Sequence, residues 1–110
     1  MTVGKLAETG MFRVLNIGKG HSVIKKIFSC DLLSLAMTKD LNNCAWFTVI
    51  GNVNIIAVAV HTGASCIVLC EGVQLDDDAM HKAIERNVTV FVSDRSVFDS
   101  ALELNALTGV

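Results

Sequence analysis

The chain has 110 residues, a length that fits one domain, and 52% of them are hydrophobic. Its net charge of -2 provides no basic surface for nucleic acid or anionic lipid. The longest apolar window, residues 44–70, contains too many polar residues for a membrane span, and the N-terminus lacks the pattern of a signal peptide. We therefore expect a cytoplasmic protein with neither nucleic-acid nor membrane partners, and the apolar excess favours burial against a partner subunit.

The first predicted element is a helix over residues 2–9. Thr2 is a suitable N-cap, and Gly10 suits the left-handed position that ends a helix. Residues 12–17 follow as an apolar run that is typical of a strand.

The next segment, Gly18-Lys19-Gly20, invites comparison with phosphate-binding loops. A P-loop requires glycine where Arg13 stands and Ser or Thr directly after Lys19. A dinucleotide-binding loop requires a third glycine where Val23 stands. We interpret the segment as a surface turn.

Residues 23–29 predict a short strand with Lys25 and Lys26 facing outward. Asp31 can cap a following helix over residues 32–38. The predicted buried face of that helix consists of Leu32, Leu35 and Ala36. A polar loop, residues 40–43, then leads into the middle of the chain.

The middle of the chain predicts a strand, a buried helix and a second strand. Residues 46–50 and 66–70 are continuous apolar runs, the pattern of parallel strands buried on both faces. Parallel neighbours need a crossover of about a dozen residues, which 52–63 supply. Asn52 can begin this helix and Gly63 can end it. An antiparallel hairpin is the alternative, because residues 55–60 are rich in β-branched side chains.

A fourth helix is indicated after residue 76. Asp76 is its expected N-cap, and Asn87 can adopt the left-handed conformation at its end. Leu75 and Met80 occupy the positions of a hydrophobic staple. Its predicted inner stripe consists of Met80, Ala83 and Ile84.

The C-terminal segment predicts a strand over residues 88–92 and a last helix that runs to about Leu107. Ser96 and Asp99 have the spacing of a capping box. The side chains expected to face inward are Phe98, Ala101, Leu102 and Leu104. Strands that alternate with helices indicate one α/β domain over residues 1–110, with a mostly parallel sheet flanked by helices.

Three apolar blocks and their turn residues, over residues 30–34, 45–59 and 66–72, resemble the DRTGG domain family. The resemblance extends over residues 3–107. The motif that names the family is altered here, since residues 21–27 lack the Asp-Arg pair and carry Lys26 and Ile27 where the glycines would stand. The resemblance implies a DRTGG-like α/β fold, homodimerisation and a regulatory role.

Ligands of parallel α/β sheets bind beyond the carboxyl ends of the strands. Polar residues follow three predicted strands, and we expect a small shared ligand-binding cleft there. Its candidate residues are Gly51, Asn52, Asn54, Glu71, Gly72, Ser93 and Asp94. The alternative is that Asn52, Ser93 and Asp94 only cap helices.

No metal, cofactor or catalytic group is predicted. The spacing of the four cysteines fits neither zinc nor iron–sulfur sites, and His21, His61 and His81 are isolated. Free cysteines, among them Cys66 and Cys70 on one strand face, are expected in the core.

These observations favour a non-catalytic regulatory domain: a homodimer that binds a small anionic ligand, such as a nucleotide, or a protein partner. A phosphoryl-transfer enzyme would need a phosphate cradle, which is absent from the sequence. The alternatives are a small enzyme, or an accessory subunit of a phosphotransfer, acyl-transfer or redox system.

Overall fold

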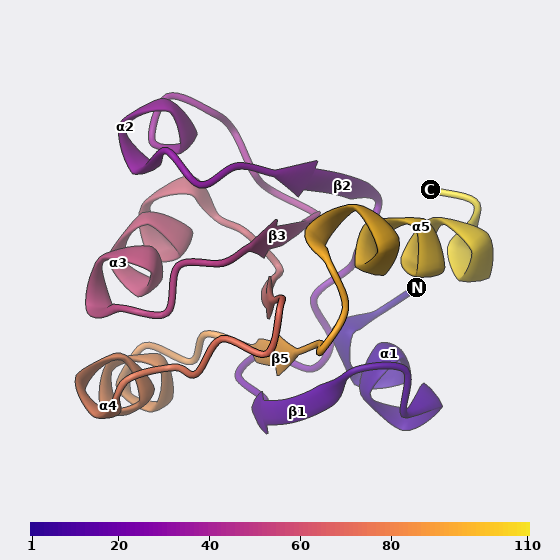
Figure 1. The fold of residues 1–110 in the computed structure, drawn as a ribbon, viewed down its shortest axis with the longest axis horizontal. Helices are drawn as coiled ribbons and strands as arrows, with labels where there is room; N and C mark the ends of the chain where they lie inside the picture. The colour runs from indigo at the N-terminus through magenta and orange to yellow at the C-terminus, as the bar shows by residue number, and fades with distance from the viewer.

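The computed structural model describes residues 1–110 and contains one five-stranded sheet (Figure 1). The strands are β1 (Arg13–Asn16), β2 (Lys26–Ser29), β3 (Cys44–Thr48), β4 (Cys66–Leu69) and β5 (Val90–Val92). The helices are α1 (Val3–Thr9), α2 (Leu33–Ala36), α3 (Val53–Thr62), α4 (Asp77–Glu85) and α5 (Val97–Thr108). The strand order is β1-β5-β4-β3-β2, and only β1 runs antiparallel to its neighbour. The predicted mostly parallel α/β fold is therefore confirmed.

The central β3-α3-β4 unit has the predicted geometry. β3 and β4 pair in parallel, with Ala45 opposite Cys66, so the hairpin alternative is wrong. The Asn52 side chain accepts the Asn54 N–H and caps α3, and Gly63 ends the helix with a φ of 79°. The start of α3 is thus set by the Asn52 side chain, and its end is set by the left-handed backbone of Gly63.

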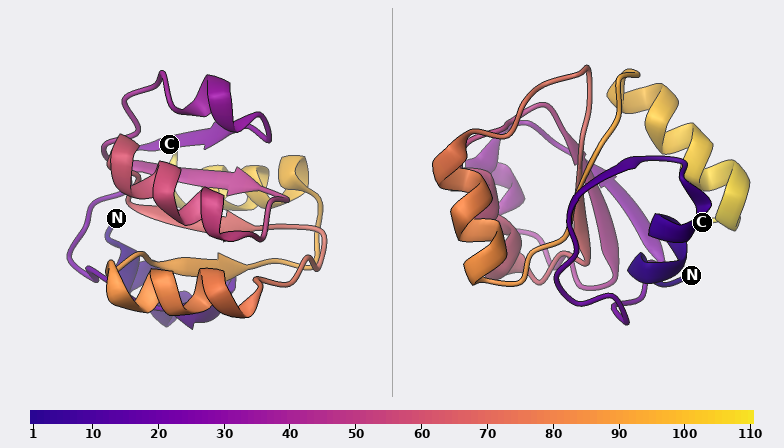
Figure 2. Two further views of the ribbon diagram at one scale, coloured as in Figure 1. Left: turned by 90° about the vertical axis from the view of Figure 1, so that its left-hand side faces the viewer. Right: turned by 90° about the horizontal axis from the view of Figure 1, so that it is seen from below.

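Helices cover both faces of the sheet. Figure 2 shows α2, α3 and α4 on one face and α1 and α5 on the other. Successive residues of β3 enter the two separate cores: Trp46 packs with α3, and Phe47 packs with the core beneath α1 and α5. This burial on both faces explains why the central strands are continuous apolar runs. None of the five helices has the length and apolar composition needed to cross a bilayer.

Trp46 anchors one of the two cores. It is fully buried, and its indole N–H donates a hydrogen bond of 3.0 Å to the Cys30 carbonyl oxygen. The predicted outward position of Lys25 and Lys26 is confirmed, since both side chains are exposed.

The prediction for α2 was wrong in two respects. Asp31 does not cap the helix; its carboxylate accepts hydrogen bonds from the Thr48 hydroxyl and the Val49 N–H instead. Leu32 and Leu35 are 61% and 46% exposed, and Ala36 is the buried residue of this region. A helix of 4 residues is too short to bury an apolar face of several side chains.

The inward faces of α4 and α5 are also rotated relative to the prediction. In α4 the buried pair is Ala79 and Ala83, and Ile84 is 54% exposed. Small side chains at these positions let the helix lie close to the sheet and to α3. The Asp76 cap is confirmed, because its carboxylate accepts the Ala79 N–H.

In α5, Leu104 is fully buried as predicted, but Phe98 and Leu102 are 70% and 49% exposed. The second fully buried position is Ser100, one helical turn before Leu104. Its hydroxyl lies 2.8 Å from the hydroxyl of Ser93, so a buried polar pair replaces the expected apolar contact. The Ser96 cap is confirmed.

Candidate functional site

The loops after β4 and β5 meet at the carboxyl edge of the sheet. The Glu71 N–H donates to the Arg95 carbonyl oxygen at 2.8 Å, and the Gly72 N–H donates to the Ser93 carbonyl oxygen at 3.1 Å. Glu71 and Gly72 both have left-handed φ angles, 63° and 68°. Four of the candidate residues, Glu71, Gly72, Ser93 and Asp94, therefore lie in two loops that are joined by hydrogen bonds.

The loop after β3 is separated from them. The Asp76 N–H donates to the Gly51 carbonyl oxygen at 2.9 Å, and a Cβ added at Gly51 would lie 2.3 Å from the Gln74 carbonyl oxygen. The segment that leads into α4 thus packs directly on Gly51. Gly51 is a packing residue here, and the candidate cleft does not extend to the end of β3.

Asn52 and Asn54 lie at the start of α3, away from the joined loops. Asn52 is the N-cap of the helix, as the alternative interpretation proposed. Asn54 borders a shallow apolar groove of about 390 Å³ between α2 and α3, which Met37 and Val58 also line. The structure therefore does not bring these two asparagines together with Asp94.

Ser93 has a structural role within its loop. It is 8% exposed, and its hydroxyl is engaged with that of Ser100 while it also accepts the Arg95 N–H at 3.1 Å. The Arg95 guanidinium forms an ion pair of 2.5 Å with Glu103. The Ser93 hydroxyl and the Arg95–Glu103 ion pair both stabilise the connection between β5 and α5.

Arg13 is the site residue that sequence reasoning missed. It is opposite Val92 in the antiparallel β1-β5 pair, so the start of β1 lies beside the carboxyl end of β5. Two adjoining grooves of about 450 and 310 Å³ share Arg13, Val92 and Asp94 in their walls. Neither Arg13 nor Asp94 forms an ion pair within the chain. No local pattern in the sequence places Arg13 in these grooves, because its position depends on an antiparallel edge strand in an otherwise parallel sheet.

The cysteines are core residues. Cys44, Cys66 and Cys70 are buried, Cys30 is half-buried, and none is in a disulfide. Burial raises the pKa of the Cys66 thiol to about 12, and it raises the pKa values of Cys44 and Cys70 as well. These thiols are therefore poor nucleophiles in the folded protein. No three His, Cys, Asp or Glu side chains lie close enough together to hold a metal ion.

The fold and this edge define the class of protein as a single α/β domain with polar grooves at the carboxyl end of its last parallel strand. No family model matches the chain, and no curated protein matches it in sequence. The relationship to the DRTGG family stays a prediction from the sequence.

Proposed function

We propose that the chain is a non-catalytic regulatory domain that acts as a homodimer and binds a small anionic ligand, such as a nucleotide, at the carboxyl edge of the sheet. The observation that carries the proposal is that Arg13 and Asp94 line the same two adjoining grooves, and that neither forms an ion pair within the chain.

The charges at this edge suit a ligand with two kinds of polar group. A guanidinium binds phosphate oxygens through two parallel hydrogen bonds, so Arg13 would receive the phosphate. A carboxylate accepts hydrogen bonds from ribose hydroxyls, so Asp94 would orient the sugar. A ligand with only negative groups would be repelled by Asp94, and the mixed charges therefore favour a nucleotide over inorganic phosphate at this edge.

The shape of the edge is suitable for such a ligand. The groove volumes fall within the range of about 300–1,000 Å³ that is typical of small-molecule sites. Gly72 lies in the wall of the larger groove, and the Asp94 carboxylate is 3.6 Å from the position of an added Gly72 Cβ. A side chain at Gly72 would narrow the groove, and its φ of 68° favours glycine in any case.

The test is calorimetric titration with AMP, adenosine and inorganic phosphate. AMP is expected to bind more tightly than either fragment, and Arg13→Gln is expected to weaken AMP binding about tenfold or more, as for the loss of a charge-assisted contact. Asp94→Asn should weaken AMP and adenosine alike. Lys39→Gln is the matched control, since Lys39 is an exposed cation that lines neither groove. Equal AMP affinity in Arg13→Gln and Lys39→Gln would overturn the proposed site.

The proposal of a homodimer is based on exposed apolar side chains. Phe98 and Leu102 are one helical turn apart on the outer side of α5, and the chain as a whole is 52% hydrophobic. A second copy that covers this stripe would remove both side chains from water. Sedimentation equilibrium is expected to show a dimer that Phe98→Asp converts to a monomer. A wild-type protein that stays monomeric at all accessible concentrations would refute this part.

A further inference from the structure

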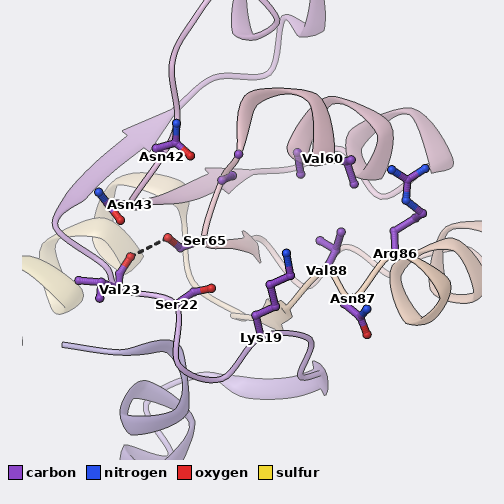
Figure 3. A pocket seen from close by; sticks show the side chains of 13 residues that line it. Lys19, Ser22, Val23, Asn42, Asn43, Val60, Ser65, Arg86, Asn87 and Val88 are labelled. Atoms are coloured by element: carbon purple, nitrogen blue, oxygen red, sulfur yellow. Dashed lines mark hydrogen bonds between the residues drawn. The ribbon is translucent and has the colours of Figure 1, made fainter.

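A polar pocket lies at the amino ends of the parallel strands, opposite the proposed nucleotide grooves at their carboxyl ends. It has a volume of about 320 Å³ and opens where the segments before β3, β4 and β5 meet the turn after β1 (Figure 3). Its walls consist of Lys19, Ser22, Val23, Asn42, Asn43, Ala59, Val60, Gly63, Ala64, Ser65, Arg86, Asn87 and Val88. None of the candidate ligand-binding residues predicted from the sequence lines this pocket.

The lining contains two cations and no carboxylate. Lys19 comes from the turn after β1, and Arg86 comes from the end of α4. Neither is in an ion pair, since the two ion pairs of the chain are Lys82–Glu85 and Arg95–Glu103. Figure 3 shows the Lys19 side chain extending into the space between Ser65 and Val88, with Arg86 on the far side of Val88. A protein of net charge -2 thus concentrates positive charge in this pocket.

The C-terminal dipoles of two helices oppose anion binding here, and their charge can be compared with the charge of the two cations. The C-termini of α3 and α4 reach the pocket at Gly63 and Arg86, and each contributes about half a negative charge. Their sum of about one negative charge is smaller than the two positive charges of Lys19 and Arg86. Asp40 lies outside the lining, where its carboxylate accepts two hydrogen bonds from Asn42, at 3.0 and 2.8 Å. Lys19 and Arg86 are thus the only charged side chains in the lining of the pocket.

The pocket also offers neutral hydrogen-bond donors. The hydroxyl of Ser22 and the side-chain amide of Asn43 line it, and both lack a hydrogen-bond partner within the chain. The Ser65 hydroxyl is already used, since it donates to the Val23 carbonyl oxygen at 2.6 Å and holds the two walls together. Asn43 and Asn87 both have left-handed φ angles, 64° and 56°, so tight turns bring their segments to the rim. Cations together with neutral donors are the groups that bind phosphate oxygens.

We infer that this pocket is a second anion site, which binds a phosphate group carried by a small metabolite or free in solution. The inference goes beyond the nucleotide site at the carboxyl edge and does not depend on it, because the two sites share no residue. Its ligand would contact segments from four different connections of the fold. Binding to the folded state alone would stabilise that state by mass action.

The test is a titration of ¹⁵N-labelled protein with inorganic phosphate and, separately, with glycerol 3-phosphate, at constant ionic strength. The backbone amides of Asn42, Asn43, Ser65 and Val88 are expected to shift together along one saturable curve. The double variant Lys19→Gln/Arg86→Gln is expected to bind at least about tenfold more weakly. Both side chains are exposed, so the variant should fold with an unchanged melting temperature.

Lys39→Gln is the matched control, since it removes an exposed cation that lines none of these pockets and should leave phosphate binding unchanged. Tighter binding of glycerol 3-phosphate than of phosphate would assign the site to a metabolite, and equal binding would assign it to the free ion. Shifts that are scattered over the surface, or that persist in the double variant, would overturn the inference. So would the absence of any saturable shift.

Discussion

The Thr48 hydroxyl donates a hydrogen bond of 2.7 Å to one oxygen of the Asp31 carboxylate, and the same oxygen accepts the Val49 N–H at 2.9 Å. Asp31 follows β2 and Thr48 ends β3, so this contact joins the carboxyl ends of two parallel strands. The sequence pattern had predicted that the Asp31 side chain caps α2.

Asp31→Ala should destabilise the protein by about 1–2 kcal/mol, because it leaves the fully buried Thr48 hydroxyl without its acceptor. Asp31→Asn is the matched variant, since its amide oxygen can still accept both hydrogen bonds, and it should cost less than half as much. Urea denaturation at neutral pH measures both. If the two variants were equally unstable, the negative charge rather than the acceptor geometry would be the important property.

Gly18 and Gly20 lie in one turn but should respond differently to alanine. A Cβ at Gly18 would lie 1.9 Å from the Asn87 carbonyl oxygen, whereas the nearest atom to a Cβ at Gly20 is 3.8 Å away. Because the first contact is with backbone that cannot rotate aside, Gly18→Ala should cost about 3 kcal/mol. Gly20→Ala should change stability by less than about 1 kcal/mol. Thermal unfolding compares the two, and similar losses would show that the close approach of the turn to Asn87 is absent.

Leu104 and Phe98 test which side of α5 faces the sheet. Leu104→Ala should destabilise the monomer by about 2–5 kcal/mol, since its side chain is fully buried beneath the helix. Phe98→Ala should have an effect of less than about 1 kcal/mol at concentrations where the protein is monomeric, because Phe98 is 70% exposed. Chemical denaturation in dilute solution is the measurement. A larger loss for Phe98→Ala than for Leu104→Ala would contradict this orientation of α5.

The buried thiols should make stability depend on alkaline pH. The pKa of Cys66 is about 12 in the folded protein, against an ordinary value of 9.0. Above pH 9 the unfolded chain releases this proton while the folded chain retains it, so stability should fall as the pH rises from 9 to 12. The shift corresponds to at most roughly 4 kcal/mol at the upper end of this range.

Cys66→Ala should flatten this decline, and Cys30→Ser is the control substitution at a cysteine that is only half-buried. The measurement is urea denaturation across the pH range, which the absence of tyrosine simplifies. A decline with the same slope in wild type and Cys66→Ala would show that other groups cause it.

Local chemistry was sufficient to predict nearly all the helices and strands. Thr2, Asn52, Asp76 and Ser96 cap their helices through side-chain hydrogen bonds to residues no more than 3 positions ahead. Such contacts depend only on residues that are close together in the sequence, so they can be predicted from a single sequence. The parallel pairing of β3 and β4 was predictable for a related reason, since 52–63 has the length of a crossover helix.

Only the tertiary structure decided which distant segments meet. The sequence did not indicate that β1 would pair antiparallel with β5, and so it did not place Arg13 and Asp94 in the walls of the same grooves. Nor did it indicate that Lys19 and Arg86 share a pocket, or that Ser100 faces inward. Caps and strand runs depend on neighbours in sequence, whereas strand order and helix rotation depend on how two cores pack on opposite faces of one sheet.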